Sequence, residues 1–325
     1  MKSITNAGLV LRGLAMGVAE VIPGVSGGTI AFITGIYKTL LDSIKAVDGS
    51  LLKSLVRMEL KAAWTKVNGN FLLWLVMGMG LGILIGVFGV SYLLEAYPEV
   101  LWSLFFGLIL ASVPFMLSQM KQRHIRHVVL LLLGAAIAYF ITTLTPASGS
   151  TNLLYLFLAG CIAISALVLP GISGSFMLVL MGLYTTVIPT VKEFLKSPEW
   201  SEFVLVSVFA AGCLTGLLAF SRLVSSAFEN YHDGTIALLS GFMLGSLNKI
   251  WPWRNPEIIL DKVSGALIDF DDSIRSRMAL APDDFKIIKE ANSLPAEYIS
   301  EPKLVACLLA LLLGLLLVGL LSRAK

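Results

Sequence analysis

The chain has 325 residues, of which 57% are hydrophobic and only 14% are charged, and its mean hydropathy is +0.85. This composition excludes a soluble domain, in which about a quarter of the residues are charged, and indicates an integral membrane protein. The net charge of +3 is small, and the basic residues gather in particular loops. That pattern indicates membrane topology rather than nucleic-acid binding.

The N-terminal part of the chain predicts a broken helix. A helix over 6–22 meets the hexad PGVSGG at 23–28, and a helix resumes over 29–41. The proline ends the first helix and the glycines permit a turn. Because broken backbone at membrane depth is tolerated only where protein buries it or where it lines a polar cavity, the hexad marks a candidate site.

The stretch 45–66 that follows is amphipathic and rich in lysine and arginine. By the positive-inside rule it is expected on the cytoplasmic surface of the membrane, on the same side as the N-terminus. Three spans are expected next, over 71–92, 100–117 and 128–144. The basic and acidic loops between them alternate in sign, as expected of a chain that crosses the membrane repeatedly.

A second broken unit, over 152–189, contains the hexad PGISGS at 170–175. Further spans are expected over 203–220 and 235–250, and the C-terminal span should return the chain to the cytoplasm. An acidic segment lies before that last span and is expected outside. The predicted units are a first repeat at 1–144, a second repeat at 145–251, an external segment at 252–303 and a C-terminal span at 304–325.

The likeness between the two halves extends beyond the hexads, since Gly13 matches Gly160 and Tyr37 matches Tyr184. A broken pair followed by three spans gives each half the opposite orientation. We therefore predict an all-α integral membrane protein with an inverted-topology repeat, each half combining a re-entrant helical hairpin with three spans or partial spans. Charge placement fits two full spans equally well, but the uncharged tips favour hairpins.

The residues after each break open a new helix, whose first N–H groups have no intrahelical partner. A phosphate or carboxylate would satisfy these groups, assisted by the helix dipole and by nearby hydroxyl groups. The alternative is that the serines only cap the helices. The candidate substrate-binding residues at the breaks are Gly24, Ser26, Gly27, Gly28, Thr29, Gly171, Ser173, Gly174 and Ser175.

Three ionisable residues in or beside apolar segments are further candidates, because a charge at the bilayer centre costs about 2.5 to 3.5 kcal/mol. Arg12 can pair with a phosphate or extend to the cytoplasmic headgroups. Glu20 can bind a coupling cation or proton, or serve as a structural partner. Arg222 closes a span and is typical of a positive-inside anchor.

No nucleophile elbow, nucleotide-binding loop or zinc-protease motif is present. The cysteines lie singly in apolar segments, and the histidines lack a metal-binding spacing. We therefore expect no catalytic residues, no metal and no cofactor other than a coupling H⁺ or Na⁺.

The segment EVIPGVSGGTIA at 20–31, with LPGISGSF at 169–176, resembles the bacterial polyprenyl-phosphate transporters, long catalogued as a domain of unknown function. The resemblance runs from about residue 13 to residue 248. It implies translocation of undecaprenyl phosphate, the carrier lipid of cell-envelope sugars, from the outer to the inner leaflet of the cytoplasmic membrane. The partner would be this lipid, with a homo-oligomer possible.

Two other functions fit parts of the same pattern. An ion-coupled secondary transporter of a small soluble anion fits an inverted repeat equally well. An intramembrane lipid phosphatase would need a nucleophile with a base, or a metal set, and the sequence offers neither.

Overall fold

The computed structural model describes residues 4–21, 26–144, 149–197, 199–264, 266–281 and 284–323. The helices and turns are α1 (Asn6–Glu20), α2 (Gly27–Ile33), α3 (Tyr37–Lys45), α4 (Gly49–Val56), α5 (Leu60–Lys66), α6 (Gly69–Ile85), a π-helical turn (Gly86–Val90), α7 (Ser91–Ala96), α8 (Pro98–Leu117), α9 (Ile125–Thr143), α10 (Leu153–Val168), α11 (Gly174–Leu180), α12 (Tyr184–Lys196), α13 (Trp200–Asn230), α14 (His232–Ser246), α15 (Asp272–Leu280), a 3-10 turn (Pro295–Glu297) and α16 (Leu304–Arg323). The strands are β1 (Arg254–Asp261), β2 (Leu267–Asp269) and β3 (Phe285–Asn292).

Most of these helices suit a lipid environment. Four helical stretches within the described residues are long and apolar enough to cross a membrane, namely 69–94, Pro98–Leu117, Ile125–Thr143 and Trp200–Asn230. α10 and most of α16 are apolar but shorter. Many leucines on the outer faces of these helices are exposed, which is stable only where lipid replaces water. The chain is therefore a predominantly helical, multi-pass membrane protein.

Each broken unit contains a second interruption that the sequence analysis missed. The helix predicted over 29–41 is wrong in this respect, because α2 ends at Ile33 and α3 begins at Tyr37. Gly35 has φ +74° in this turn, and Gly182 has φ +67° at the matching place between α11 and α12. The Ile36 N–H bonds to the Ala31 carbonyl at 3.0 Å. This bond and the left-handed glycine form a Schellman-type helix end.

Helix pairs pack closely through glycine in both halves. α1 packs along α6, and α10 packs along α13. A Cβ atom at Gly13 would overlap the Leu75 carbonyl oxygen, and one at Gly212 would overlap that of Phe157. Small residues of this kind let membrane helices approach backbone to backbone.

The remaining long helices exchange partners between the two halves. α9 packs along α14, with Gly134 against Gly241, and α16 packs along α8, with Gly107 against the Leu311 carbonyl. α14 lies largely buried at the centre of the bundle. The last helix of the chain therefore joins the first half, and α9 of the first half joins the second.

The segment after α14 is not helical throughout, so the all-α description applies only to the membrane part. β1 pairs antiparallel with β2 and β3 in the order β2-β1-β3, and Ile259, Ile274 and Phe285 form a small core with α15. Hydrogen bonds from the Ser264 and Val263 backbone hold the pKa of Asp261 below its usual range. Acidic composition alone did not predict this sheet.

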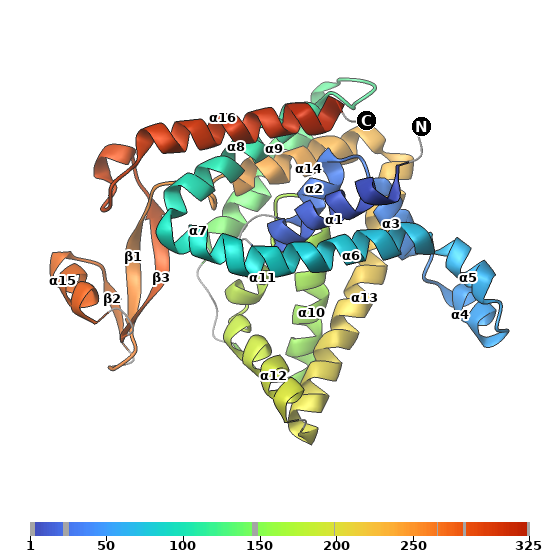
Figure 1. The fold of residues 1–325 in the computed structure, drawn as a ribbon, viewed down its shortest axis with the longest axis horizontal. Coiled ribbons are helices and arrows are strands. Elements are labelled where there is room, and N and C mark those ends of the chain that lie inside the picture. The colour runs from blue at the N-terminus through green and yellow to red at the C-terminus, as the bar shows by residue number, and fades with distance from the viewer. Residues whose placement is uncertain are drawn as a thin grey trace.

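Figure 1 shows α6 and α16 running along the longest axis of the molecule. The α4–α5 pair lies at one end of this axis, and the sheet with α15 lies at the other end. The two interrupted units lie between these ends. The basic stretch and the acidic segment are thus on opposite sides of the helical bundle.

Candidate functional site

The breaks of the two interrupted units are in direct contact. We call the described residues 20–21 and 26–29 the first tip, and 167–176 the second tip. Ser26 Oγ donates a hydrogen bond to the Leu167 carbonyl at 3.0 Å, and the Gly171 N–H donates to Thr29 Oγ1 at 3.0 Å. Ser26 and Thr29 are fully buried. Motifs about 140 residues apart in sequence therefore form one polar centre.

Glycine permits this close contact. A Cβ atom at Gly28 would lie 2.6 Å from the Val168 carbonyl oxygen, which also accepts a hydrogen bond from the Tyr37 hydroxyl at 3.1 Å. Gly171 has φ +86°, and a Cβ atom there would lie 2.8 Å from Met243 Cα on α14. Both a left-handed backbone and a close approach thus require glycine at position 171.

At the first tip, the chain supplies its own anion to the start of α2. Glu20 Oε1 accepts a hydrogen bond from the Gly27 N–H at 2.7 Å. Ser26 Oγ accepts one from the Gly28 N–H at 3.0 Å, as an N-cap residue does. A carboxylate is favoured here by the unpaired amides and the helix dipole. The first helix of the chain therefore caps the second.

At the second tip, the corresponding amides remain open. Leu167 stands where the first tip has a glutamate. Ser173 Oγ lies 2.9 Å from Ser175 Oγ and makes no capping hydrogen bond. Among the described residues, the N–H groups of Gly174, Ser175 and Phe176 have no hydrogen-bond acceptor. The two hydroxyls and these amides together can receive an anion.

Two predicted site residues lie away from the tips. Arg12 precedes Glu20 by eight positions on α1, which is about 12 Å along a helix axis. Its Nη1 atom is buried and has no hydrogen-bond partner in the part of the chain that the structure describes. Arg222 is exposed, and its Nη2 donates to the Val47 carbonyl at 2.8 Å. The predicted residue Gly24 lies outside the described residues.

A cavity of about 900 Å³ lies beside the tips. Glu20, Ser175 and Tyr184 line it on the helical side, and β1 and β3 line it on the other side. Its volume is in the range of small-molecule binding sites. The sequence analysis missed Lys249 and Arg254, which also line it. The signal was a lysine at the next-to-last position of the span expected over 235–250.

On the opposite side of the bundle, polar contacts join α3 to α13. Lys45 Nζ lies 3.0 Å from Glu229 Oε1, and Ser225 Oγ donates to Asp42 Oδ1 at 3.1 Å. These contacts join the first half to the second near the α4–α5 end. We call them the α3–α13 latch.

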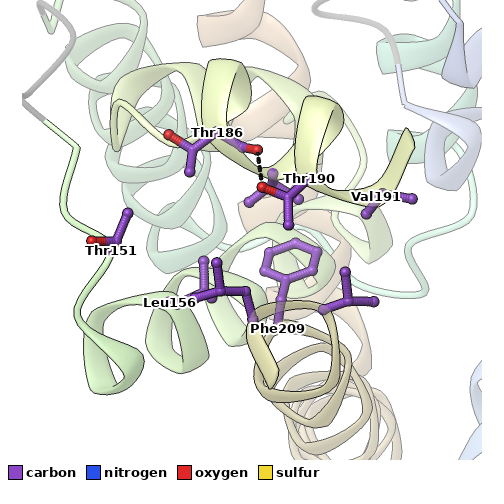
Figure 2. Close-up of a pocket in the computed structure, with 9 residues that line it drawn as sticks. Thr151, Leu156, Thr186, Thr190, Val191 and Phe209 are labelled. Carbon is purple, nitrogen blue, oxygen red and sulfur yellow. Dashed lines mark hydrogen bonds between the residues drawn. The ribbon is translucent and has the colours of Figure 1, made fainter. Parts of the chain in front are cut away.

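A second cavity, between α10, α12 and α13, is too small to hold a headgroup. Figure 2 shows Leu156, Thr190 and Phe209 around it, with the Thr190 hydroxyl bonded to the Thr186 carbonyl at 2.8 Å. Its volume of about 10 Å³ is close to the space of one water molecule. The large cavity is the candidate site, because residues of both tips line it.

Comparison with known proteins assigns the family. Residues 16–268 match the model of the VCA0040-like family, which is described as undecaprenyl phosphate translocase-like. The chain belongs to this family. It is similar to a polyprenyl-phosphate transporter of Vibrio cholerae, with 40% identity over 314 residues and 97% of each chain covered. No solved structure matches the chain.

A second relative is a polyprenyl-phosphate transporter of Staphylococcus aureus, with 31% identity over 269 residues, 78% of this chain and 89% of that one. The resemblance drawn from the two hexads is thereby confirmed. The family match includes both tips, Lys249 and Arg254, whereas Arg12 and α16 lie outside it. The Vibrio relative nevertheless aligns with nearly the whole chain.

Proposed function

We propose that the chain translocates undecaprenyl phosphate from the outer to the inner leaflet of the cytoplasmic membrane and so returns the carrier lipid to cell-envelope synthesis. The names of both relatives support polyprenyl phosphate as the substrate class. One observation carries the mechanism, namely that two interrupted helices meet beside a cavity that reaches Glu20 and Ser175.

The phosphate binds at the second tip in this proposal. A phosphate monoester carries about −1.5 to −2 charge at neutral pH, and burying it without partners is costly. The open N–H groups of Gly174 and its neighbours, with the hydroxyls of Ser173 and Ser175, replace its water shell. At the first tip, the amide of Gly27 is already bonded to a carboxylate. The first tip therefore supports the second tip and does not bind the phosphate itself. The polyprenyl tail stays in lipid.

The proposed transport cycle uses an inverted repeat of re-entrant hairpins. The matching pairs α1–α6 and α10–α13, and the exchanged pairs α8–α16 and α14–α9, support such a repeat. In this arrangement, rocking of one half against the other exposes a central site to each side in turn. The cavity is on the sheet side and the α3–α13 latch closes the other side. This conformation corresponds to an outward-facing state.

Arg12 and Arg222 belong to the later, inward part of the path in this proposal. The unpartnered Nη1 of Arg12 supports a role in receiving the phosphate after the tips. The α4–α5 pair would lie on the inner leaflet, because it combines basic residues with exposed apolar ones. Val56 is 77% exposed and Met58 is 83% exposed. Such a surface suits anionic headgroups and the acyl boundary.

Glu20 couples the cycle to H⁺ or Na⁺ in this proposal. Its carboxylate bonds the first turn of α2 and also lines the cavity. Neutralisation by a proton or a sodium ion would weaken the charge-assisted bond to the Gly27 N–H. The contact between α1 and α2 would then change with the state of the coupling ion.

The proposal is tested with purified protein in vesicles that contain undecaprenyl phosphate in both leaflets. An impermeant phosphatase added outside hydrolyses only the exposed lipid, so about half should remain in protein-free vesicles and none with the active protein. Protection of the inner pool in both samples would contradict translocation.

The same vesicles separate the two alternative functions. Release of inorganic phosphate without added phosphatase would indicate a lipid phosphatase. Inhibition by inorganic phosphate that equals inhibition by a prenyl phosphate would indicate a carrier of small soluble anions.

A further inference from the structure

The turn between α14 and β1 presents a lysine to the large cavity. Lys249 lines this cavity together with Ser175 and Phe176, the second and third residues of α11. Its Nζ atom lies 4.9 Å from the centroid of the Phe176 ring. Among the described residues, the ammonium has no acidic partner within ion-pair distance and no hydrogen-bond acceptor.

The turn that carries this lysine is anchored on both sides. Asn292 Nδ2, at the end of β3, donates to the backbone carbonyl of Asn248 at 3.1 Å and to its Oδ1 at 2.8 Å. Asn248 Nδ2 donates to Thr142 Oγ1 on α9 at 2.8 Å. These contacts fix the position of the lysine at the junction of the sheet and the bundle.

The other charged groups on the cavity wall already have partners. Arg254 pairs with Glu290 at 3.0 Å, and Lys289 pairs with Glu257 at 2.9 Å. The carboxylate of the first tip is bonded to the start of α2. Lys249 is therefore the charged side chain of this described wall that forms no ion pair.

We infer that Lys249 recognises the phosphate monoester headgroup of the lipid on the sheet side, before the phosphate reaches the second tip. This inference rests on the proposed function. An ammonium is a compact charge with three donors and binds phosphate well. Contact with the face of Phe176 orients it and leaves N–H groups for an anion. Arg254 is less suited, because it is held between Trp102 and Glu290.

The test is calorimetric binding of farnesyl monophosphate to the full chain in detergent. Lys249→Gln should weaken binding by about tenfold, the loss expected for one charge-assisted hydrogen bond. Lys249→Arg should restore most of the affinity, because the charge is kept. Lys289→Gln is the matched control on the same wall and should bind within about twofold of the natural chain, since that lysine is paired.

Each outcome decides the inference. If Lys249→Gln binds normally while Ser175→Ala binds weakly, the recognition role of Lys249 is wrong and the proposed function stands. If the natural chain binds no farnesyl monophosphate and moves no lipid, the proposed function fails.

Inorganic phosphate that binds as tightly as farnesyl monophosphate, with the same dependence on Lys249, would overturn the lipid assignment. Unchanged thermal unfolding of Lys249→Gln would exclude misfolding as the cause of weak binding.

Discussion

The two tips share a sequence motif but differ in the hydrogen bonding of the first N–H groups of the helix that follows. At the first tip, side chains of the same tip accept these N–H groups: Glu20 accepts from the Gly27 N–H, and Ser26 accepts from the Gly28 N–H. At the second tip, Ser173 makes no cap, and the first three amides of α11 have no acceptor among the described residues. Similar sequences thus give one helix whose first N–H groups are bonded, α2, and one helix whose first N–H groups are free to bind an anion, α11.

The difference at the first amide of each helix follows from a single position. Glu20 in the first copy corresponds to Leu167 in the second copy. Both side chains lie near the first glycine of the following helix, Gly27 or Gly174. A carboxylate satisfies that amide, whereas an alkyl chain leaves it unpaired. In the proposed function, the repeated motif therefore binds phosphate at one copy only, because the other copy contains its own carboxylate.

The largest effect is expected from Gly171→Ala, which removes the open geometry of the second tip. A left-handed backbone costs a non-glycine residue about 1 to 2 kcal/mol, and the added Cβ atom would lie 2.8 Å from Met243 Cα. We expect a lower unfolding temperature in detergent and loss of lipid transport. Gly80→Ala is the control, since a Cβ atom there meets nothing within 4 Å. An unfolding temperature equal to that of the control would show that the tips tolerate a side chain.

A smaller effect is expected from Leu167→Glu, which copies the first tip into the second. The new carboxylate would lie near the Gly174 N–H and compete with phosphate for the same amides. We expect farnesyl monophosphate binding to fall by about tenfold. Leu167→Met is the matched control, because methionine is similar in size but has neither a charge nor an acceptor oxygen. Binding by Leu167→Glu that equals binding by Leu167→Met would show that the open amides are not the phosphate site.

The smallest effect on stability is expected from Glu20→Gln. The amide oxygen of glutamine can still accept the Gly27 N–H, so the loss should be about 1 kcal/mol, the difference between a charged and a neutral acceptor. Transport by this variant should lose its dependence on pH or sodium, because the side chain no longer titrates. An unaltered dependence in vesicle assays across pH 5 to 8 would assign Glu20 a structural role.

Much of the membrane part is predictable from local pattern. The apolar runs, the two breaks and the basic stretch at 45–66 follow from composition and spacing, and α8 begins and ends close to the predicted span. The turns at Gly35 and Gly182 were missed, because an isolated glycine in an apolar run is also compatible with a continuing helix. The sheet after α14 was missed because its strands have little alternation of polar and apolar residues.

The candidate site was predictable only in part. Ser26, Thr29 and Gly171 do meet, as the paired hexads predicted, but Arg12 and Arg222 make no hydrogen bond to the tips within the described residues. Lys249 was overlooked, because a lysine at the end of an apolar span usually marks only the membrane boundary.

The amino-acid sequence by itself determined the breaks at the two hexads, which segments suit lipid and to which family the chain belongs. These properties depend on neighbouring residues, on apolar length and on likeness to relatives. Only the tertiary structure decided that Glu20 fills one tip and that the other stays open beside Lys249. A hydrogen bond or an unpaired charge depends on distances of about 3 Å between groups distant in sequence, which only packing of the chain sets.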